Sequence, residues 1–185
     1  MPKNTKLTRA VWYFRLRELP SRKGVYDFVS ICLHLQDRRT IIDVLLNALS
    51  RLEYRGYDSA GLSVDGDREK EALLFKQVGK VNALRKHISE SSVDMDRTFV
   101  SHAGMAHTRW ATHGTPSPLN CHPHKSDPRG EFTVVHNGII TNYRELRLVL
   151  EKRGYKFETD TDTEAVAVLV KYFWDSYPEN RKPDF

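Results

Sequence analysis

The stretch AGLSVDGDREKEALLFKQV, residues 60–78, decides the fold class. Two mostly apolar segments, Ala60–Val64 and Ala72–Val78, lie on either side of the turn-forming residues Asp65-Gly66-Asp67. A turn between two such segments is typical of a β-hairpin. We therefore expect two antiparallel strands here, and with them a sheet whose strands pair locally.

Strands and helices alternate on both sides of this hairpin. Before it, the apolar segment Val25–Leu35 predicts a strand. Apolar residues at helical spacing from Ile41 onwards then predict a helix that ends at Gly56. After the hairpin, residues 81–89 predict a short helix and Phe99–Thr108 predicts another strand.

The C-terminal half begins with residues 109–130, which are rich in His, Pro, Gly and Ser. This composition predicts a long loop, and long loops in compact domains are often functional. Phe132–His136 predicts a strand after the loop, and Tyr155–Glu158 predicts a shorter one.

Two helices of this half are predicted from capping boxes at their N-termini. Asn142 with Glu145 opens one helix, and Thr161 with Glu164 opens a second over residues 162–176. Because strands outnumber helices and pair locally, the predicted class is α+β with a mostly antiparallel sheet.

The composition fits one domain with an arm. The chain has 185 residues, of which 39% are hydrophobic, and no apolar run reaches the roughly 18 residues that a membrane helix needs. The net charge of +5 is uneven, because residues 1–39 hold nine Lys/Arg and three Asp/Glu. We expect a basic, disordered arm over residues 1–24, one domain over 25–176 and a polar tail over 177–185. Alternatively, the arm contacts nucleic acid or anionic lipid, or is a transit-like leader.

Three positions are candidates for contact with a small charged ligand. Arg109, at a strand end beside a Gly/Pro-containing loop, could grip a carboxylate with its planar fork or form a surface ion pair. Asn137-Gly138 is typical of a tight hairpin turn, but an Asn amide and a neighbouring backbone N–H can also form an oxyanion hole. Asp162 could complement the N-terminus of the following helix or face a ligand ammonium.

Four histidines, His107, His113, His122 and His124, suggest a metal site as one hypothesis. Their spacing fits neither an HExxH pattern nor paired CxxC motifs, so structural or loop-ordering histidines are favoured over zinc. We expect no metal and no other cofactor.

The two cysteines, Cys32 and Cys121, are too few for a disulfide framework and favour a reducing, cytoplasmic setting. Cys121 precedes His122, which suggests a thiol nucleophile beside its base. Adjacent residues of an extended segment point in opposite directions, however, so an inert thiol is favoured for Cys121, as it is for Cys32.

Five segments taken together resemble one family. The segments are RLEYRGYDSAG (51–61), HTRWATHG (107–114), NCHP (120–123), HNGII (136–140) and TDTE (161–164). Their order and spacing, from about Ile41 to Trp174, are similar to those of the glutaminase half of the glutamine–fructose-6-phosphate aminotransferases. These belong to the N-terminal-nucleophile glutamine amidotransferases, whose nucleotide- and asparagine-forming branches vary two of the segments.

The resemblance implies a fold and an activity. The fold would be an N-terminal-nucleophile-hydrolase-like αββα sandwich of two antiparallel sheets. The activity would be hydrolysis of glutamine to glutamate and ammonia without a cofactor. In the whole enzyme the ammonia passes to a sugar-isomerising domain, which yields glucosamine 6-phosphate. The expected partners are glutamine and either a full-length aminotransferase or a second copy of the chain, with no membrane and no nucleic acid.

The resemblance also assigns roles to residues. It implies that Arg109 binds the glutamine carboxylate and that Asp162 binds its ammonium group. Asn137 and Gly138 would form the oxyanion hole, and Arg55 would orient the N-terminal catalytic region. Four further residues would line the pocket and its loop: Trp110, Thr112, His113 and His122.

Both ends of the chain depart from the family pattern. The family's nucleophile is a cysteine directly after the initiator methionine, whereas this sequence opens Met1-Pro2-Lys3 and an ungapped alignment places the expected cysteine at about Gly24. The family's glutaminase half continues beyond Trp174 with further strands and then the isomerase domains. We therefore expect a sandwich incomplete at both ends and an inactive chain. The alternatives are a non-catalytic glutamine-binding or partner-binding module, and a nucleic-acid-binding protein with a basic arm.

Overall fold

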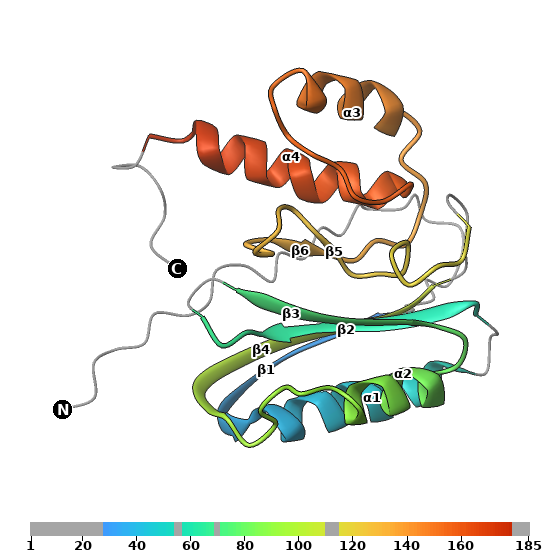
Figure 1. Ribbon diagram of the computed structural model, residues 1–185, viewed down its shortest axis with the longest axis vertical. Coiled ribbons are helices and arrows are strands. Elements are labelled where there is room, and N and C mark those ends of the chain that lie inside the picture. Colours follow the sequence, from blue (N-terminus) through green and yellow to red (C-terminus); the bar gives the residue numbers. More distant parts are fainter. Residues whose placement is uncertain (1–27, 54–56, 69–70, 110–114, 179–185) are drawn as a thin grey trace, which may run out of the picture.

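The computed structural model describes residues 28–53, 57–68, 71–109 and 115–178, so the predicted arm lies outside it (Figure 1). Within these ranges lies a four-stranded antiparallel sheet with the order β1-β4-β2-β3. Its strands are β1 (Phe28–Asp37), β4 (Thr98–Arg109), β2 (Ser59–Asp65) and β3 (Ala72–Val78). The predicted hairpin is confirmed as the β2–β3 pair.

Two helices cover one face of this sheet, called here the lower face. α1 (Arg38–Leu52) follows β1 directly, and α2 (Val81–Ser89) follows β3 (Figure 1). Asp37 caps α1, since its side chain accepts a hydrogen bond from the Thr40 N–H at 2.7 Å. None of the described helices has the length and apolar character needed to cross a membrane. Buried apolar side chains from α1, α2 and the sheet form the core between them: Ile41, Ile42, Leu45, Leu46, Leu49, Leu62, Val64, Phe75, Val81, Leu84 and Ile88.

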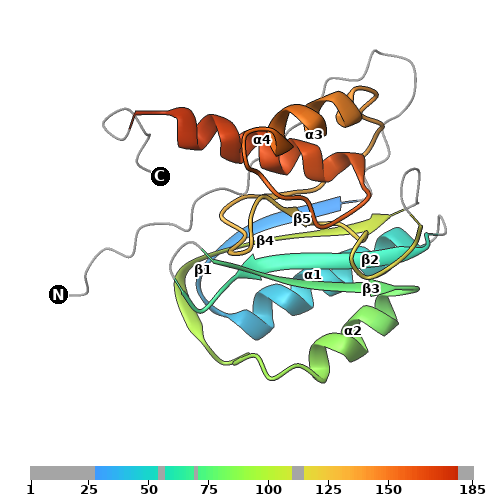
Figure 2. The ribbon, with the colours of Figure 1, turned by 45° about the horizontal axis from the view of Figure 1, so that its top comes forward.

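The C-terminal half lies on the opposite face of the sheet, called here the upper face. β5 (His124–Lys125) and β6 (Thr133–Val134) form a short antiparallel pair. α4 (Asp162–Ser176) packs on this pair, and α3 (Tyr143–Glu151) packs on α4. Figures 1 and 2 show the resulting layers of helices, sheet, sheet and helices. The predicted α+β class and the sandwich of two antiparallel sheets are confirmed.

Three predictions in the C-terminal half, one loop and two strands, need correction. The loop predicted over 109–130 contains β5, and the strand predicted over Phe132–His136 shortens to β6. Tyr155–Glu158 is not a strand, and no described strand pairs with it. Its end is fastened to α4 instead, because the Glu158 and Thr159 N–H groups donate to the Glu164 carboxylate at 2.7 and 2.8 Å. Side-chain oxygens thus satisfy backbone groups that a neighbouring strand would otherwise satisfy.

Both capping-box predictions are also wrong, although Asn142 and Thr161 do occupy N-cap positions. Within the described residues, neither side chain makes a capping hydrogen bond. The Thr161 hydroxyl instead lies 3.1 Å from His124 Nε2, and Glu164 bonds to the preceding segment. A polar side chain that finds a buried partner elsewhere does not cap its helix.

Candidate functional site

The candidate site lies on the upper face, at the end of β4. Ala106 belongs to the core below the sheet, so the alternation of the strand turns His107 and Arg109 upward. Both side chains are buried, and in register His107 lies opposite Gly61 of β2. A buried arginine at this place makes the surface ion pair considered for Arg109 the weaker interpretation.

Asn137 is fixed by a hydrogen bond to β4. Its Oδ1 lies 2.8 Å from His107 Nε2, so donation by the ring N–H orients the amide and leaves its NH2 group directed away from His107. Gly138 follows with φ of +147°, and a Cβ added there would lie 2.9 Å from His136 Nε2. No described strand follows, so the hairpin-turn interpretation of Asn137-Gly138 is wrong. The geometry leaves a positioned amide donor beside a residue that must be glycine.

Three buried histidines surround this point. The His107 and His122 rings stack with 4.5 Å between centroids, and the His122 and His124 rings meet edge to face at 4.6 Å. The pKa of His107 is lowered to about 4, chiefly by burial and also by the charges of Arg109 and His136, against the opposing effect of the Asn137 hydrogen bond. Burial likewise holds the pKa values of His122 and His124 well below the usual range. All three rings are therefore neutral near pH 7.

His122 can lie this close to the sheet because Gly61 of the neighbouring strand β2 has no side chain. A Cβ at Gly61 would clash with the His122 carbonyl oxygen, so the His122 main chain lies directly on β2. The His136 N–H is 3.4 Å from His122 Nδ1, which makes Nδ1 the acceptor and places the ring proton on Nε2. A glycine inside a strand permits this close backbone approach. The predicted role of His122 as a pocket residue is compatible with its place between Gly61 and His107.

Asp162 is the first residue of α4 and is buried. Its Oδ2 accepts a hydrogen bond from the Ile140 N–H at 2.7 Å, so it holds the segment after Gly138 against the helix. Its second oxygen, Oδ1, lies 3.5 Å from the Thr163 hydroxyl, which can donate to it. Its proposed contact with an ammonium group stays a prediction.

Neither cysteine is placed to act as a nucleophile at this site. Cys32 is exposed on β1, opposite Ala103 and four positions along the strand from Phe28, which pairs with His107. Cys121 is buried, its Sγ lies 3.1 Å from the Ser117 carbonyl oxygen, and burial raises the pKa of its thiol. A thiol with a raised pKa is a weak nucleophile at neutral pH, so the inert interpretation of Cys121 is favoured.

Some predicted residues have no described position. Arg55, Trp110, Thr112 and His113 lie outside the described residues, as does Gly24, and their roles stay predictions. Among the residues that are described, no three His, Cys, Asp or Glu side chains are grouped as a metal ion would require.

Three supporting residues were missed by sequence reasoning. His107 was considered only as a metal ligand or structural histidine, Thr161 only as a cap, and Gly61 only as part of a motif. The alternation of His107 with Arg109 on one strand could have indicated a shared face. The closeness of Gly61 to His122 has no signal in the sequence beyond a glycine inside a strand.

Comparisons with known proteins show which family the chain resembles. The family described as glutamine amidotransferase domain matches residues 107–180. The chain is 52% identical, over 155 residues and 84% of its length, to a probable glutamine–fructose-6-phosphate aminotransferase (isomerizing) of Schizosaccharomyces pombe. It is 50% identical, over 157 residues and 85% of its length, to the glutamine–fructose-6-phosphate aminotransferase (isomerizing) of Saccharomyces cerevisiae. It is 51% identical, over 144 residues and 75% of its length, to glutamine–fructose-6-phosphate aminotransferase (isomerizing) 2 of Homo sapiens. It spans about a fifth of these relatives, 22%, 22% and 21% of their lengths.

Proposed function

Since the chain belongs to the glutamine amidotransferase domain family, we propose that its upper face holds one molecule of free glutamine. The observation that carries the proposal is the convergence on His107. Asn137 is bonded to this ring at 2.8 Å, His122 stacks on it at 4.5 Å, and the buried Arg109 follows two residues along the same strand. A fixed amide donor next to a buried cation suits a ligand that has both a carbonyl and a carboxylate.

Each polar group of glutamine has a partner in this proposal. The fork of Arg109 pairs with the α-carboxylate, and Asp162 pairs with the α-ammonium group. The Asn137 NH2 group and the Gly138 N–H donate to the side-chain carbonyl oxygen, where negative charge develops when the amide is attacked. Arg55, Trp110, Thr112 and His113 complete the proposed pocket, by the resemblance alone.

For the longer proteins of which this domain is a part, we propose the activity that the relatives' name describes. Glutamine would be hydrolysed to glutamate, and the ammonia would convert fructose 6-phosphate to glucosamine 6-phosphate in a sugar-isomerising domain. The sugar step is not assigned to these 185 residues. A second copy or a full-length aminotransferase stays a predicted partner, and the two unpaired cysteines favour the cytoplasm.

We further propose that the 185-residue chain binds glutamine without cleaving it. Attack on the amide needs an activated thiolate within hydrogen-bond reach of its base. Cys121 is held by the Ser117 carbonyl with a raised pKa, and Cys32 is exposed on β1, four positions from the residue that pairs with His107. Neither thiol meets the requirement.

Calorimetric titration of the chain with glutamine tests the binding proposal. We expect Arg109→Lys, which keeps the charge but removes the two-point fork, to weaken binding at least about tenfold. Asp162→Asn should weaken it comparably. Arg129→Lys is the matched control, because Arg129 is exposed. Absence of binding to the folded wild-type chain, or equal affinity in Arg109→Lys, would refute the proposal.

An assay of ammonia release from glutamine tests the proposal that the chain does not cleave glutamine. The wild-type chain should stay at the background rate of the buffer. Turnover that persists in the double variant Cys32→Ala, Cys121→Ala would show that another group performs the attack and that the proposal of binding without cleavage is wrong.

A further inference from the structure

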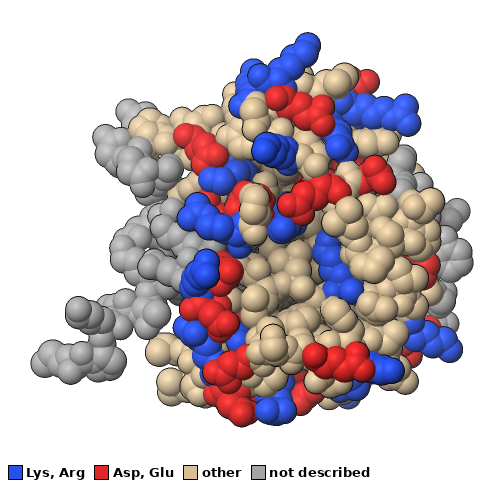
Figure 3. Space-filling model, viewed as in Figure 1, with Lys and Arg blue, Asp and Glu red and all other residues tan. Residues whose placement is uncertain are grey.

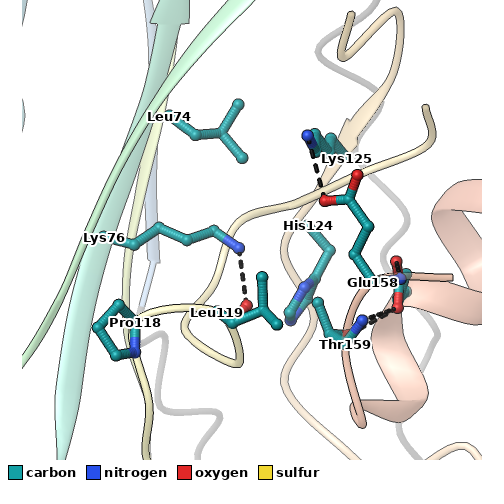
Figure 4. A pocket seen from close by; sticks show the side chains of 9 residues that line it. Leu74, Lys76, Pro118, Leu119, His124, Lys125, Glu158 and Thr159 are labelled. Carbon is teal, nitrogen blue, oxygen red and sulfur yellow. Dashed lines mark hydrogen bonds and ion pairs between the residues drawn. The ribbon is translucent and has the colours of Figure 1, made fainter. Parts of the chain in front are cut away.

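A cavity separate from the candidate site lies on the other side of Gly61. Lys76 of β3 pairs with Gly61 on one side, as His107 of β4 does on the other. The cavity has a volume of about 300 Å³ and is lined by residues of β3, β5, the segment Pro118–Leu119 and the approach to α4. Figure 4 shows Lys76 reaching into it from β3, with His124 and Thr159 across from it. No lining residue is one of the proposed glutamine contacts.

The two carboxylates of this cavity already have partners. Glu158 forms an ion pair with Lys125 at 3.2 Å. Glu164 accepts hydrogen bonds from the N–H groups of Glu158 and Thr159 and from the Thr159 hydroxyl, all at 2.7–2.8 Å. These contacts hold both carboxylates along one wall, and neither carboxylate forms an ion pair with Lys76 within the described residues.

Lys76 is that remaining cation. Within the described residues its ammonium makes one hydrogen bond, to the Leu119 carbonyl oxygen at 3.2 Å, and no ion pair. Burial lowers its pKa to about 8, although the charge of Glu164 acts in the opposite direction. A partly buried ammonium without an anionic partner is costly, and an incoming anion would offset that cost.

A further polar group faces the same space without a partner. His124 lines the cavity and is fully buried, and its Nδ1 has no hydrogen-bond partner among the described residues. The other walls are apolar, formed by Leu74, Pro118 and Leu119. Figure 3 shows the surface hollowed between the lower and upper layers, with mostly uncharged atoms on the floor and charged side chains at the rim.

We propose that this cavity binds a small organic monocarboxylate, with its anionic group on Lys76 and its apolar body against Leu74, Pro118 and Leu119. One unneutralised cation beside an apolar wall suits one carboxylate on an apolar body. A phosphate dianion suits it less, because the single ammonium of Lys76 can offset one negative charge and not two. The volume is at the lower end of the range for small-molecule sites, which sets the size of the ligand.

The probe is 3-phenylpropanoate, titrated into the ¹⁵N-labelled chain by NMR, with the neutral 3-phenylpropanamide as the matched ligand. We expect the acid to bind at least about tenfold more tightly than the amide, since the charge on Lys76 is the discriminating group. Lys76→Met, which keeps the length of the stem, should remove that difference. Lys156→Met is the matched protein control, because Lys156 is exposed.

The backbone signals that shift separate this inference from the glutamine proposal. Shifts at Leu74, Leu119 and Thr159 that persist with saturating glutamine support binding in this separate cavity. Equal binding of acid and amide, equal binding by the folded Lys76→Met variant, or shifts centred on Asn137 and Gly138 would each overturn it. The glutamine proposal would then still stand on its own titration.

Discussion

The two faces of the four-stranded sheet are built from opposite kinds of side chain. Below the sheet, α1 and α2 cover a core of aliphatic side chains in which Ile41, Leu45 and Leu49 have no exposed surface. Above it, the buried side chains include His107 and Arg109 of β4 and His124 of β5. Strand β4 contributes to both faces, with Ala106 in the core below and His107 and Arg109 above, because alternate residues of a strand point to opposite faces.

The comparison indicates that the lower face mainly stabilises the fold and that the upper face holds the polar groups of the candidate site. Apolar contacts below the sheet need no partners and stabilise the fold at roughly 25 cal/mol per Å² of buried area. Polar groups above it are costly to bury unless each is paired. Glu164 with its three donors and His124 with Thr161 show that pairing. We therefore expect substitutions below to change stability, and substitutions above to change binding and pH dependence as well.

The largest expected effect is Leu45→Ala on α1. Leu45 is fully buried under the sheet, so the variant leaves a cavity and should lower the free energy of unfolding by about 3 kcal/mol. Val44→Ala, one position along the same helix, is the control, because Val44 is 38% exposed and should cost less than about 1 kcal/mol. Urea unfolding measures both. Similar losses would mean that the lower face is not the tightly packed core described above.

Gly61→Ala probes the contact between the layers. The new Cβ would meet the His122 carbonyl oxygen, and because both groups belong to backbone we expect a loss of about 2 kcal/mol and weaker glutamine binding. Gly66→Ala is the control, since its Cβ would meet the side chain of Glu71 at 2.7 Å, and a side chain can rotate away. A Gly61→Ala chain with normal stability and binding would show that His122 is free to move.

Acid should act on the upper face first. The folded pKa of His107 is about 4, below the unfolded value of 6.5, so its neutral burial stabilises the fold fully above pH 6.5 and progressively less as the pH falls toward 4. This group alone should remove roughly 2 kcal/mol between pH 7 and pH 5. Urea titrations at the two pH values measure the loss.

Two substitutions sharpen the assignment of this pH dependence. Gln cannot titrate, so His107→Gln should reduce the loss of stability between pH 7 and pH 5 by roughly the 2 kcal/mol that His107 contributes, while the buried His122 and His124 still contribute theirs. His87→Gln is the control, because His87 is exposed on α2 and should leave the change as it is. If His107→Gln keeps the full wild-type loss, His107 does not contribute to it.

Much of the lower half could be predicted from the sequence. The hairpin, the helix over 81–89 and the strand before Arg109 follow from local periodicity, which is dictated by the single apolar face that each element presents. β5 and the segment 155–158 could not be predicted, because two-residue pairing and a side-chain tether depend on contacts between residues far apart in sequence.

The residues proposed to contact the ligand could be predicted from the sequence, but the residues that hold them in place could not. Arg109, Asn137 and Asp162 were singled out for chemical reasons and by resemblance. That His107 fixes the Asn137 amide, and that Gly61 admits His122, depends on which strands become neighbours. Strand order is a property of the whole chain, so local patterns do not specify it.

The smallest expected effect concerns the helix caps. Asp37 accepts from the Thr40 N–H at 2.7 Å, whereas the Asn142 side chain makes no capping bond within the described residues. Asp37→Ala should therefore lower the urea midpoint by a fraction of the Leu45→Ala effect, because it leaves a helix N–H without its acceptor. Asn142→Ala should leave the midpoint unchanged. An equal decrease in both variants would mean that Asn142 caps α3 in solution and that the two helices begin in the same way.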